Sequence, residues 1–431
     1  MRPPLLYHIY VAATAMLVPF FAWIETRKLR GAGVPVVRAH EKLGHATADR
    51  PGGGPLIWFH AASVGESMSV LALISEMGRL APRLRFLITS GTATSAKMVG
   101  DRLPPRSVHQ FAPLDAAGPV QRFLKHWRPD GVVFVESELW PQMLRKTKAS
   151  GARMILVNAR LSASSRAAWQ RRPKTAAYVL ECFDLILTQN DEMAQAMVDM
   201  HAPADRVARG FNLKALSDPL AQDPVVLAQV RTSLKGRPVW VAASTHKGEE
   251  EIILRAHQAL LKTRPDLLLL LVPRHPNRGA EVARLVAQHG LSCAVRSKSQ
   301  PPEDAAVYLA DTLGELGNWY ALSDVIFLGG SLKPIGGHNP FEVAQAGSGV
   351  LSGPEVFNFS ETYAEMVQNG SARLVATETE IKDAVNRLLT DRDARDAAGR
   401  AARGYVRGKS TYLEMMAQRL IRALHVGDPT A

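Results

Sequence analysis

The sequence predicts an α/β protein made of two doubly wound domains, and three observations support this prediction. The chain has 431 residues, too many for one ordinary hydrophobic core and suited to two domains of roughly 200 residues each. Short apolar segments alternate with longer amphipathic ones, which is the pattern of parallel strands and crossover helices. The alternation pauses once, between Asn212 and Pro224, and then restarts. We therefore expect one domain over residues 31–220 and a second over residues 221–405.

The expected strands are the most apolar segments of each half. Parallel strands place ligand sites outside their carboxyl ends, so the polar residues that follow each strand are the candidates for a functional site. The expected strands are 56–62, 85–90, 131–137, 153–160 and 184–190 in the first domain, and 238–244, 266–275, 306–311, 324–330 and 349–353 in the second.

The two ends of the chain are expected to be helical. Residues 5–24 carry no formal charge, and this length is sufficient to cross a bilayer as a helix. Arg27, Lys28 and Arg30 follow, which predicts that the rest of the chain lies on the cytoplasmic side of the membrane. Residues 1–30 are therefore interpreted as a membrane anchor, with a cleaved signal peptide as the alternative. Residues 406–431 are expected to form a helix that packs back on the first domain.

Charge and cysteine content restrict the function classes. Lys and Arg outnumber Asp and Glu by 52 to 40, a net charge of +12, which favours an anionic partner. No nucleic-acid-binding motif is present, so anionic lipid is the expected partner and nucleic acid is not. The two cysteines, Cys182 and Cys293, are too few and too distant for a disulfide framework or a cysteine metal site.

The first domain carries polar motifs at its expected strand ends. Ser63 and Glu66 have the S-x-x-E spacing of a helix capping box, yet a carboxylate at this position can also take a proton from a sugar hydroxyl. The remaining candidates are hydroxyl, acidic and basic side chains at further strand or helix ends: Thr92, Glu136, Glu138, Arg160 and Lys214.

The second domain has a comparable set. Arg274 lies between two prolines after a very apolar strand and is placed to bind a phosphate through its planar guanidinium. Glycines near Asn339 and Glu342 let a ligand approach the backbone, and Glu342 can accept hydrogen bonds from ribose hydroxyls. Motifs of dinucleotide-binding dehydrogenases, P-loop NTPases and zinc proteases are absent from the sequence. The residues alone therefore predict a membrane-attached protein that binds an anionic, nucleotide-linked ligand.

Nine segments in the same order resemble the Kdo (3-deoxy-D-manno-octulosonic acid) transferases of lipopolysaccharide biosynthesis. They are HAASVGE, TSGTATSAKM, FAPLD, ESELWP, NARLS, AASTHKGEE, VPRHPNR, DTLGELGNWY and GGSLKPIGGHNPFEVAQAG. The resemblance implies a GT-B glycosyltransferase with two Rossmann-like domains facing an interdomain cleft, and an N-terminal helix anchored in the bacterial inner membrane. It implies inverting transfer of Kdo from CMP-Kdo to lipid IVA, the lipid A precursor, with release of CMP and without a cofactor or metal ion.

The same resemblance implies roles for individual residues. Glu66 corresponds to the general base, and Glu136 and Lys214 correspond to transition-state stabilisers. A Phe inserted at position 211 alters the family's G-N-L-K element around Lys214. The positions that correspond to CMP-binding residues are Pro273, Arg274, Leu313, Gly314, Glu315, Asn339, Pro340, Phe341 and Glu342, and further donor or acceptor contacts are expected at Ser63, Gly65, Thr92, Glu138, Arg160, Ser244, Thr245 and Gly337.

Two alternatives remain open at this point. A GT-B transferase that uses a UDP-sugar would share the fold, since fold alone does not determine function. A membrane-tethered receptor for anionic glycolipid would use the basic surface without catalysis.

Overall fold

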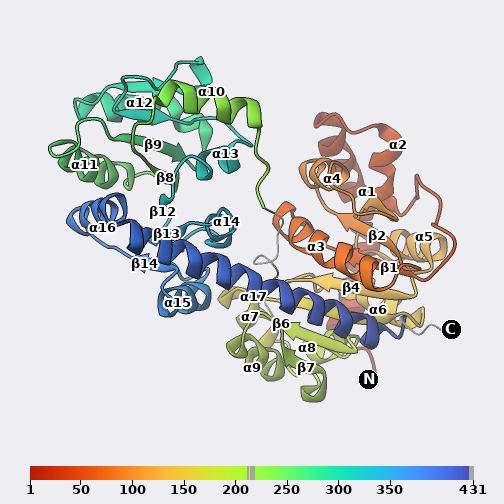
Figure 1. Cartoon of the computed structure of the whole chain (residues 1–431). Coiled ribbons are helices and arrows are strands. Elements are labelled where there is room, and N and C mark those ends of the chain that lie inside the picture. The colour runs from red at the N-terminus through yellow and green to blue at the C-terminus, as the bar shows by residue number, and fades with distance from the viewer. Residues whose placement is uncertain (211–212, 214–218, 427–431) are drawn as a thin grey trace. The chain divides into compact units, whose positions relative to one another are not determined.

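The computed structural model describes residues 1–210, 213 and 219–426. Contacts within the chain divide it into two compact units: Met1–Ser217 together with Ser410–Ala431 form unit 1, and Asp218–Lys409 form unit 2. Each unit contains one parallel seven-stranded sheet covered by helices (Figure 1). The predicted doubly wound α/β architecture is confirmed.

Unit 1 is wound outward from a central strand. Its strand order is β3-β2-β1-β4-β5-β6-β7, so the chain reverses its direction of winding between β1 and β4. Neighbouring side chains of β1 point to opposite faces, and Trp58 packs in one core cluster while Ile57 and Phe59 pack in the other. The strands are β1 (Leu56–His60), β2 (Arg85–Ser90), β3 (Ser107–Phe111), β4 (Gly131–Val135), β5 (Arg153–Ala159), β6 (Leu185–Thr188) and β7 (Val207–Arg209).

Helices cover both faces of this sheet. The crossover helices are α3 (Val64–Leu80), α4 (Ala93–Gly100), α5 (Ala117–Trp127), α6 (Pro141–Ala149), α7 (Ala163–Gln170), α8 (Pro173–Leu180) and α9 (Asp191–Asp199), with the 3-10 turn η2 (Ala204–Arg206).

Unit 2 repeats the same winding with the order β10-β11-β9-β8-β12-β13-β14, and its direction reverses between β8 and β12. Its strands are β8 (Val239–Thr245), β9 (Leu268–Pro273), β10 (Cys293–Val295), β11 (Val307–Leu309), β12 (Val325–Leu328), β13 (Gly349–Ser352) and β14 (Ala372–Leu374). Its helices are α10 (Pro224–Leu234), α11 (Glu250–Leu261), α12 (Gly279–Gln288), α13 (Leu316–Tyr320), α14 (Phe341–Gln345), α15 (Ser360–Gln368) and α16 (Glu378–Thr390), with the 3-10 turns η4 (Pro276–Arg278) and η5 (Arg296–Lys298).

The C-terminal helix α17 (Arg392–Leu424) begins in unit 2 and ends in unit 1. Its last turns place Met416, Leu420 and Leu424 in the same core cluster as Ile57 and Val133 of the first sheet. The final part of α17 is therefore an integral part of the unit 1 core.

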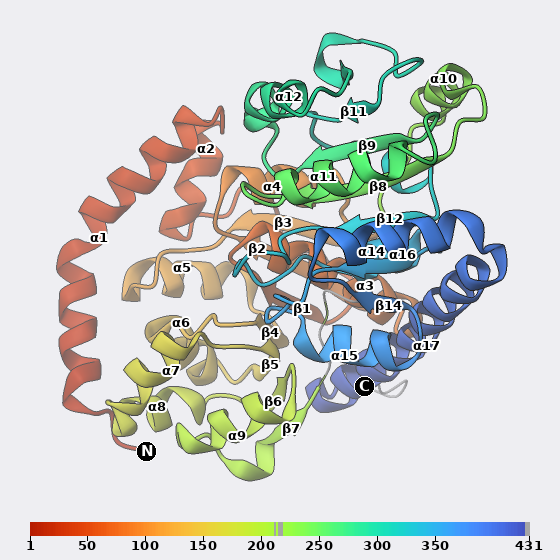
Figure 2. The same ribbon diagram turned by 90° about the vertical axis from the view of Figure 1, so that its left-hand side faces the viewer.

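The N-terminal segment consists of α1 (Leu5–Gly31), α2 (Val36–Ala39) and the 3-10 turn η1 (His40–Leu43). By length and composition, α1 is a candidate membrane span, and it belongs to unit 1. It runs along the side of unit 1 that carries α5, α6 and α8 (Figure 2).

Candidate active site

In each unit, the predicted site residues that the structure describes lie at the carboxyl ends of strands, and those at the ends of β1, β4, β8 and β12 lie beside the strand pair where the winding reverses. This is the usual ligand-binding edge of a doubly wound sheet.

Glu66 lies in the first turn of α3, directly after β1. Its Oε2 accepts a hydrogen bond from the Ala62 N–H at 2.8 Å, and its Oε1 accepts one from the Ser63 hydroxyl at 2.9 Å. Ser63 in turn caps the helix by accepting from the Glu66 N–H. The capping box is thus formed, but each carboxylate oxygen has two lone pairs and retains acceptor capacity.

The environment of Glu66 favours its protonated form. Burial raises the pKa of the carboxyl above its ordinary value, and the negative charges of Glu138 and Glu136 act in the same direction. The hydrogen bonds from Ser63 and Ala62 oppose this rise without cancelling it. A raised pKa at a strand end makes Glu66 a stronger base than an ordinary exposed glutamate.

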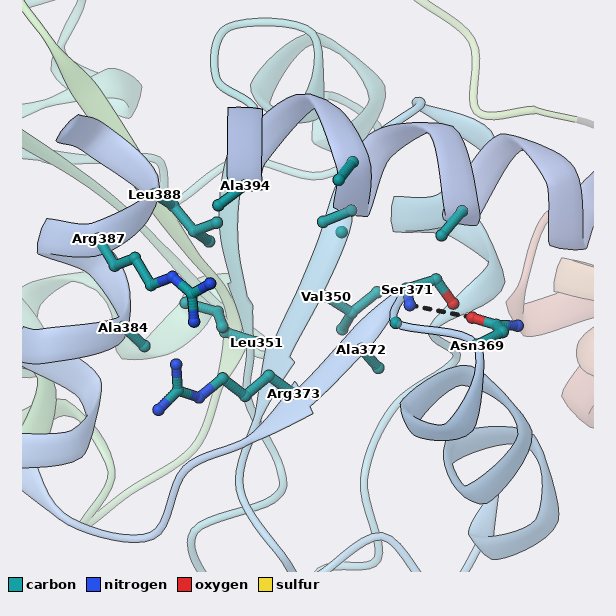
Figure 3. Close-up of a pocket in the computed structure, with 15 residues that line it drawn as sticks. Val350, Leu351, Asn369, Ser371, Ala372, Arg373, Ala384, Arg387, Leu388 and Ala394 are labelled. Carbon is teal, nitrogen blue, oxygen red and sulfur yellow. Dashed lines mark hydrogen bonds between the residues drawn. The ribbon is translucent and has the colours of Figure 1, made fainter. Parts of the chain in front are cut away.

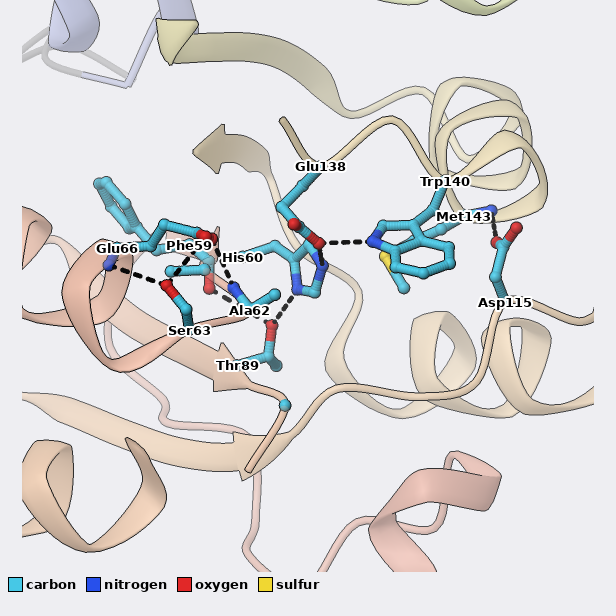
Figure 4. A network of polar contacts seen from close by, with 12 residues as sticks. Phe59, His60, Ala62, Ser63, Glu66, Thr89, Asp115, Glu138, Trp140 and Met143 are labelled. Atoms are coloured by element: carbon cyan, nitrogen blue, oxygen red, sulfur yellow. Dashed lines mark hydrogen bonds and ion pairs between the residues drawn. The ribbon is translucent and has the colours of Figure 1, made fainter. Parts of the chain in front are cut away.

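Glu138 is held in a network that connects β1, β2 and the β4–α6 turn (Figure 4). Its Oε2 lies 3.2 Å from Nε2 of His60 and also accepts a hydrogen bond from the Trp140 indole. The other nitrogen of His60 lies 3.0 Å from the hydroxyl of Thr89. Burial alone would raise the pKa of Glu138, but His60 and Trp140 together hold it below its ordinary value. Glu138 therefore stays ionised to more acidic pH than an ordinary glutamate, and its charge contributes to the raised pKa of Glu66.

His60 and Asp115 support this network, although neither was predicted as a site residue. Asp115 accepts hydrogen bonds from the N–H groups of Gln142 and Met143, which fixes the start of α6 directly after Trp140. The motif signal was present, since Asp115 ends FAPLD and His60 begins HAASVGE. Their partners come from distant segments and could not be read from spacing.

Glu136 directly follows β4 and has a positive φ of 56°, and Asn158 in β5 has the same φ. Such left-handed residues are strained unless they are glycine, and they occur often at functional sites. The Asn158 amide donates to Glu136 Oε1 at 3.2 Å and accepts from the Leu213 N–H at 3.3 Å. Asn158 thus connects Glu136 to the residue that precedes Lys214, while Lys214 itself lies outside the described residues.

The other unit 1 candidates lie at the same edge with simpler environments. Thr92 is the N-cap of α4 and forms a capping box with Ser95. Gly65 is exposed in the first turn of α3, with open space where a Cβ would be. Arg160 follows β5, and its N–H points to the carbonyl of Glu136.

In unit 2, β8 ends in an irregular segment that carries the predicted Ser244 and Thr245. The register with β9 shifts between Ala243 and Thr245, and Ser244 has a φ of 56°. The Thr245 hydroxyl donates to Glu250, which also pairs with Arg278 at 2.7 Å. Burial raises the pKa of Glu250.

Glu249, which sequence reasoning did not single out, connects the two loops at the winding reversal. Its fully buried carboxylate accepts from the N–H groups of His246, Gly330, Ser331 and Leu332 at 2.7–2.9 Å. Four such hydrogen bonds hold the end of β8 against the loop after β12. Three consecutive glutamates, Glu249, Glu250 and Glu251, are typical of a helix start and do not single out Glu249.

His246 and His338 form a second link between these loops. Their Nε2 atoms are 2.9 Å apart, their rings are stacked, and His275 lies edge-on to His246. Burial is the main cause that lowers the pKa of His338 to about 4 and also lowers that of His246. A Cβ at Gly330 would lie 2.7 Å from the ring of His338, so glycine is required there.

Arg274 is an exposed cation at this edge. The two imidazoles are neutral near pH 7, whereas Arg274 is exposed and forms no salt bridge within the described part of the chain. Burial raises the pKa of Glu342. A hydrogen bond from Asn339 and the charge of Arg274 both oppose this rise. Arg274 is thus available to an anionic ligand beside Asn339 and Glu342.

The other predicted CMP-binding residues differ in how much of their side chains is exposed to solvent. Leu313 is 78% exposed and precedes Gly314, which has a φ of 83°. Glu315 forms an ion pair with Arg296 at 2.6 Å, and this is the main cause that lowers its pKa. Three other positions are buried and would offer a ligand mainly their backbone: Pro273, Pro340 and Phe341, with the Phe341 ring stacked on Tyr405. Gly337 has a φ of 77° beside Val356.

A cavity of about 330 Å³ in unit 2 lies apart from these residues. Arg373 and Arg387 line it between β14 and α16 (Figure 3). It reaches Gly349 and Ala372, the first residues of β13 and β14, and therefore lies toward the amino ends of the strands. None of the predicted site residues lines it.

Comparison with known proteins assigns the family. Residues 37–217 match the family model described as 3-deoxy-D-manno-octulosonic-acid transferase (kdotransferase). The 3-deoxy-D-manno-octulosonic acid transferase of Bordetella pertussis is 32% identical over 414 residues, covering 92% of this chain and 94% of its own. That of Haemophilus influenzae is 34% identical and covers 83% and 84%. The chain belongs to the Kdo transferase family.

The fold agrees with this family assignment. A glycosyltransferase structure from Rickettsia africae is similar over 86% of this chain and 99% of its own, with a TM-score of 0.60 and 13% identity. At this identity the likeness concerns the fold alone. The chain is a glycosyltransferase of the GT-B type, built from two Rossmann-like units and preceded by an apolar helix.

Proposed function

We propose that this Kdo transferase transfers Kdo from CMP-Kdo to lipid IVA in lipopolysaccharide biosynthesis, with inversion at the anomeric carbon and with Glu66 as the general base. The observation that supports this most directly is the buried Glu66 carboxylate at the carboxyl edge of β1, with a raised pKa and fixed orientation. A base that is oriented before substrate binds needs no reorganisation during the reaction.

In the proposed step, the acceptor hydroxyl attacks the anomeric carbon of Kdo. The hydroxyl proton passes to Glu66, a new C–O bond forms, and the bond to the phosphate of CMP breaks with its electron pair leaving on CMP. The ionised Glu138 raises the proton affinity of Glu66, and Glu136 is placed to balance positive charge that develops on the sugar. Lys214 is proposed to complete this charge balance.

The donor is proposed to bind at the carboxyl edge of unit 2. CMP-Kdo carries a phosphate and a sugar carboxylate, and Arg274 offers a planar guanidinium that suits either group. Leu313 offers an exposed apolar surface for the base, and Glu342 can accept hydrogen bonds from the ribose. The proposed unit 2 site therefore recognises the nucleotide, while the unit 1 site performs the proton transfer.

The chain is further proposed to act on the cytoplasmic face of the bacterial inner membrane, attached through α1. The helix is long and apolar enough to bind a membrane, and basic residues follow it. The lipid acceptor resides in such a membrane.

The test is a transfer reaction with purified full-length chain, CMP-Kdo generated in situ and lipid IVA in detergent. Mass spectrometry should show a product heavier by Kdo, and NMR should show the inverted anomeric configuration. Transfer should persist with chelator present, and CMP should inhibit it more strongly than UDP. Stronger inhibition by UDP would support the UDP-sugar alternative, and lipid IVA binding without any transfer would support the receptor alternative.

A further inference from the structure

One face of α1 is docked on unit 1 through Tyr7, Tyr10 and Thr14 in its first half and through Leu29 near its C-terminal end. Tyr7, Val11, Thr14 and Val18 are partly shielded from solvent, and Ala22 and Leu29 are buried. These positions recur every three or four residues, so they form a single stripe. Between Tyr7 and Leu29 this stripe extends about 33 Å along the helix, a length comparable to the hydrocarbon thickness of a bilayer.

The stripe is attached by polar and aromatic contacts rather than by apolar packing alone. The Tyr10 hydroxyl donates to Asp115 Oδ2 at 2.7 Å, and Thr14 accepts a hydrogen bond from the side chain of Gln142. Tyr7 packs edge-on against Tyr178 with ring centroids 5.0 Å apart. The partners lie before α5, in α6 and in α8, which are surface elements of a water-soluble sheet domain.

The opposite face of α1 is apolar and open. It carries eight large apolar side chains that are each at least 40% exposed: Leu5, Leu6, Ile9, Met16, Leu17, Phe20, Phe21 and Trp23. An exposed apolar surface of this extent on one side of a helix is typical of a membrane contact.

Basic side chains stand at the C-terminal end of this open face. Arg27 lies over the Trp23 ring at 5.4 Å, and Arg30 and His40 line the same concavity beside η1. Within the described residues, neither Arg27 nor Arg30 forms a salt bridge with an acid. Unpaired arginines beside an interfacial tryptophan complement the phosphates of anionic lipid headgroups.

We propose that α1 lies in the plane of an anionic phospholipid bilayer and does not cross it. The open face is buried among the outer acyl carbons, Arg27 and Arg30 contact headgroup phosphates, and the docked stripe stays on unit 1. A helix that crossed the bilayer could keep the docked stripe on unit 1 only if Asp115 and the neighbouring helix ends entered the hydrocarbon. Unsatisfied polar groups are excluded from that region. A crossing helix would therefore have to release the docked stripe. This inference rests on the proposed membrane attachment and specifies its geometry.

Depth measurements on the full chain test the proposal. In a background with Cys182→Ser and Cys293→Ser, spin labels are placed singly at Leu5→Cys, Met16→Cys and Trp23→Cys, which share the open face. The protein is bound to vesicles of phosphatidylethanolamine and phosphatidylglycerol, and label depth is read from relative accessibility to oxygen and to an aqueous nickel complex. Equal, shallow depths at all three positions are expected. A label at position 16 that lies deeper than both others, by about 10 Å relative to the label at position 23, would overturn the proposal.

A binding measurement without labels provides the second test. Charge reversal at Arg27→Glu with Arg30→Glu should weaken binding to phosphatidylglycerol vesicles at least about tenfold. The matched reversal Arg400→Glu with Arg407→Glu, on exposed positions of α17 in unit 2, should leave it unchanged. Equal loss in both pairs would contradict the proposed headgroup contact.

A measurement of Kdo transfer in detergent separates the proposed in-plane geometry of α1 from the proposed reaction. Transfer by a chain whose labels show a crossing helix would reject the in-plane geometry and leave the proposed reaction intact. Equal shallow depths in a chain that does not transfer Kdo would support the geometry and reject the reaction.

Discussion

The turn after the first strand of unit 1 and the turn after the first strand of unit 2 each place a glutamate at a helix start, and the two glutamates have different roles. Glu66 opens α3 after β1, and Glu249 immediately precedes α11 after β8. Glu66 receives one backbone and one hydroxyl hydrogen bond and lies near two other carboxylates. Glu249 receives four backbone hydrogen bonds and has no exposed surface.

The difference shows that the number of residues between a strand and a glutamate does not decide whether that glutamate takes part in the reaction or holds the backbone. A carboxylate that accepts four N–H groups is used fully in holding backbone, and it has little capacity left for a substrate. A carboxylate with two donors and like-charged neighbours retains acceptor capacity and has an increased proton affinity. The two residues therefore predict separable defects when each is replaced by its isosteric amide.

The largest expected effect is that of Glu66→Gln on the rate of Kdo transfer. The amide keeps the size of the side chain but cannot take the proton, so kcat should fall by about 10²–10⁴-fold. The melting temperature should change little, because the amide can still accept from Ser63. Glu76→Gln, near the other end of α3, is the matched control and should keep full rate. A normal rate in Glu66→Gln would remove Glu66 from the mechanism.

Glu249→Gln should give the converse result, a loss of stability in unit 2. An amide NH₂ would face backbone N–H groups, leaving buried donors unsatisfied at a cost of about 2–4 kcal/mol. Thermal or denaturant unfolding measures this loss. Glu251→Gln, two residues along the chain, should be nearly neutral because Oε2 of Glu251 has no hydrogen-bond partner among the residues that the structure describes. Unchanged unfolding in Glu249→Gln would contradict the structural role.

These two residues also illustrate how far sequence reasoning extends. The apolar periodicity predicted the five inner strands of each sheet, because parallel strands buried on two faces must be apolar throughout. It missed the edge strands β3, β7, β10 and β14. The S-x-x-E spacing predicted the hydrogen bonds of Glu66, because a capping box is local. Glu249 could not be recognised, since three of its four donors lie more than eighty residues away. The contacts of Asp115 with α6 and Tyr10 are non-local for the same reason.

A smaller effect is expected from Glu138→Gln on the pH dependence of transfer. Burial is the main cause of the raised pKa of Glu66, and the charge of Glu138 is the second. Removing this charge lowers the pKa of Glu66, so the base stays ionised to more acidic pH. The acid limb of the kcat/KM profile should therefore move to lower pH. A limb that stays in place or moves upward would show that Glu138 does not act on the base by charge.

The smallest effect is expected from Ser63→Ala, and its direction is the opposite. The Ser63 hydroxyl stabilises the charged carboxylate, and its loss raises the pKa of Glu66 further. Glu66 then takes up its proton at a higher pH than in the unmodified chain, so the acid limb of the kcat/KM profile should move to higher pH. The helix also loses its N-cap, at a cost of about 1 kcal/mol, which unfolding measures independently. We expect the acid limb to shift in opposite directions in Ser63→Ala and Glu138→Gln, and Ser63→Ala to lose stability by this amount. Together these results would establish that the Glu66 carboxylate serves both the helix start and the reaction. Equal profiles in both variants would mean that Glu66 is only the structural counterpart of Glu249.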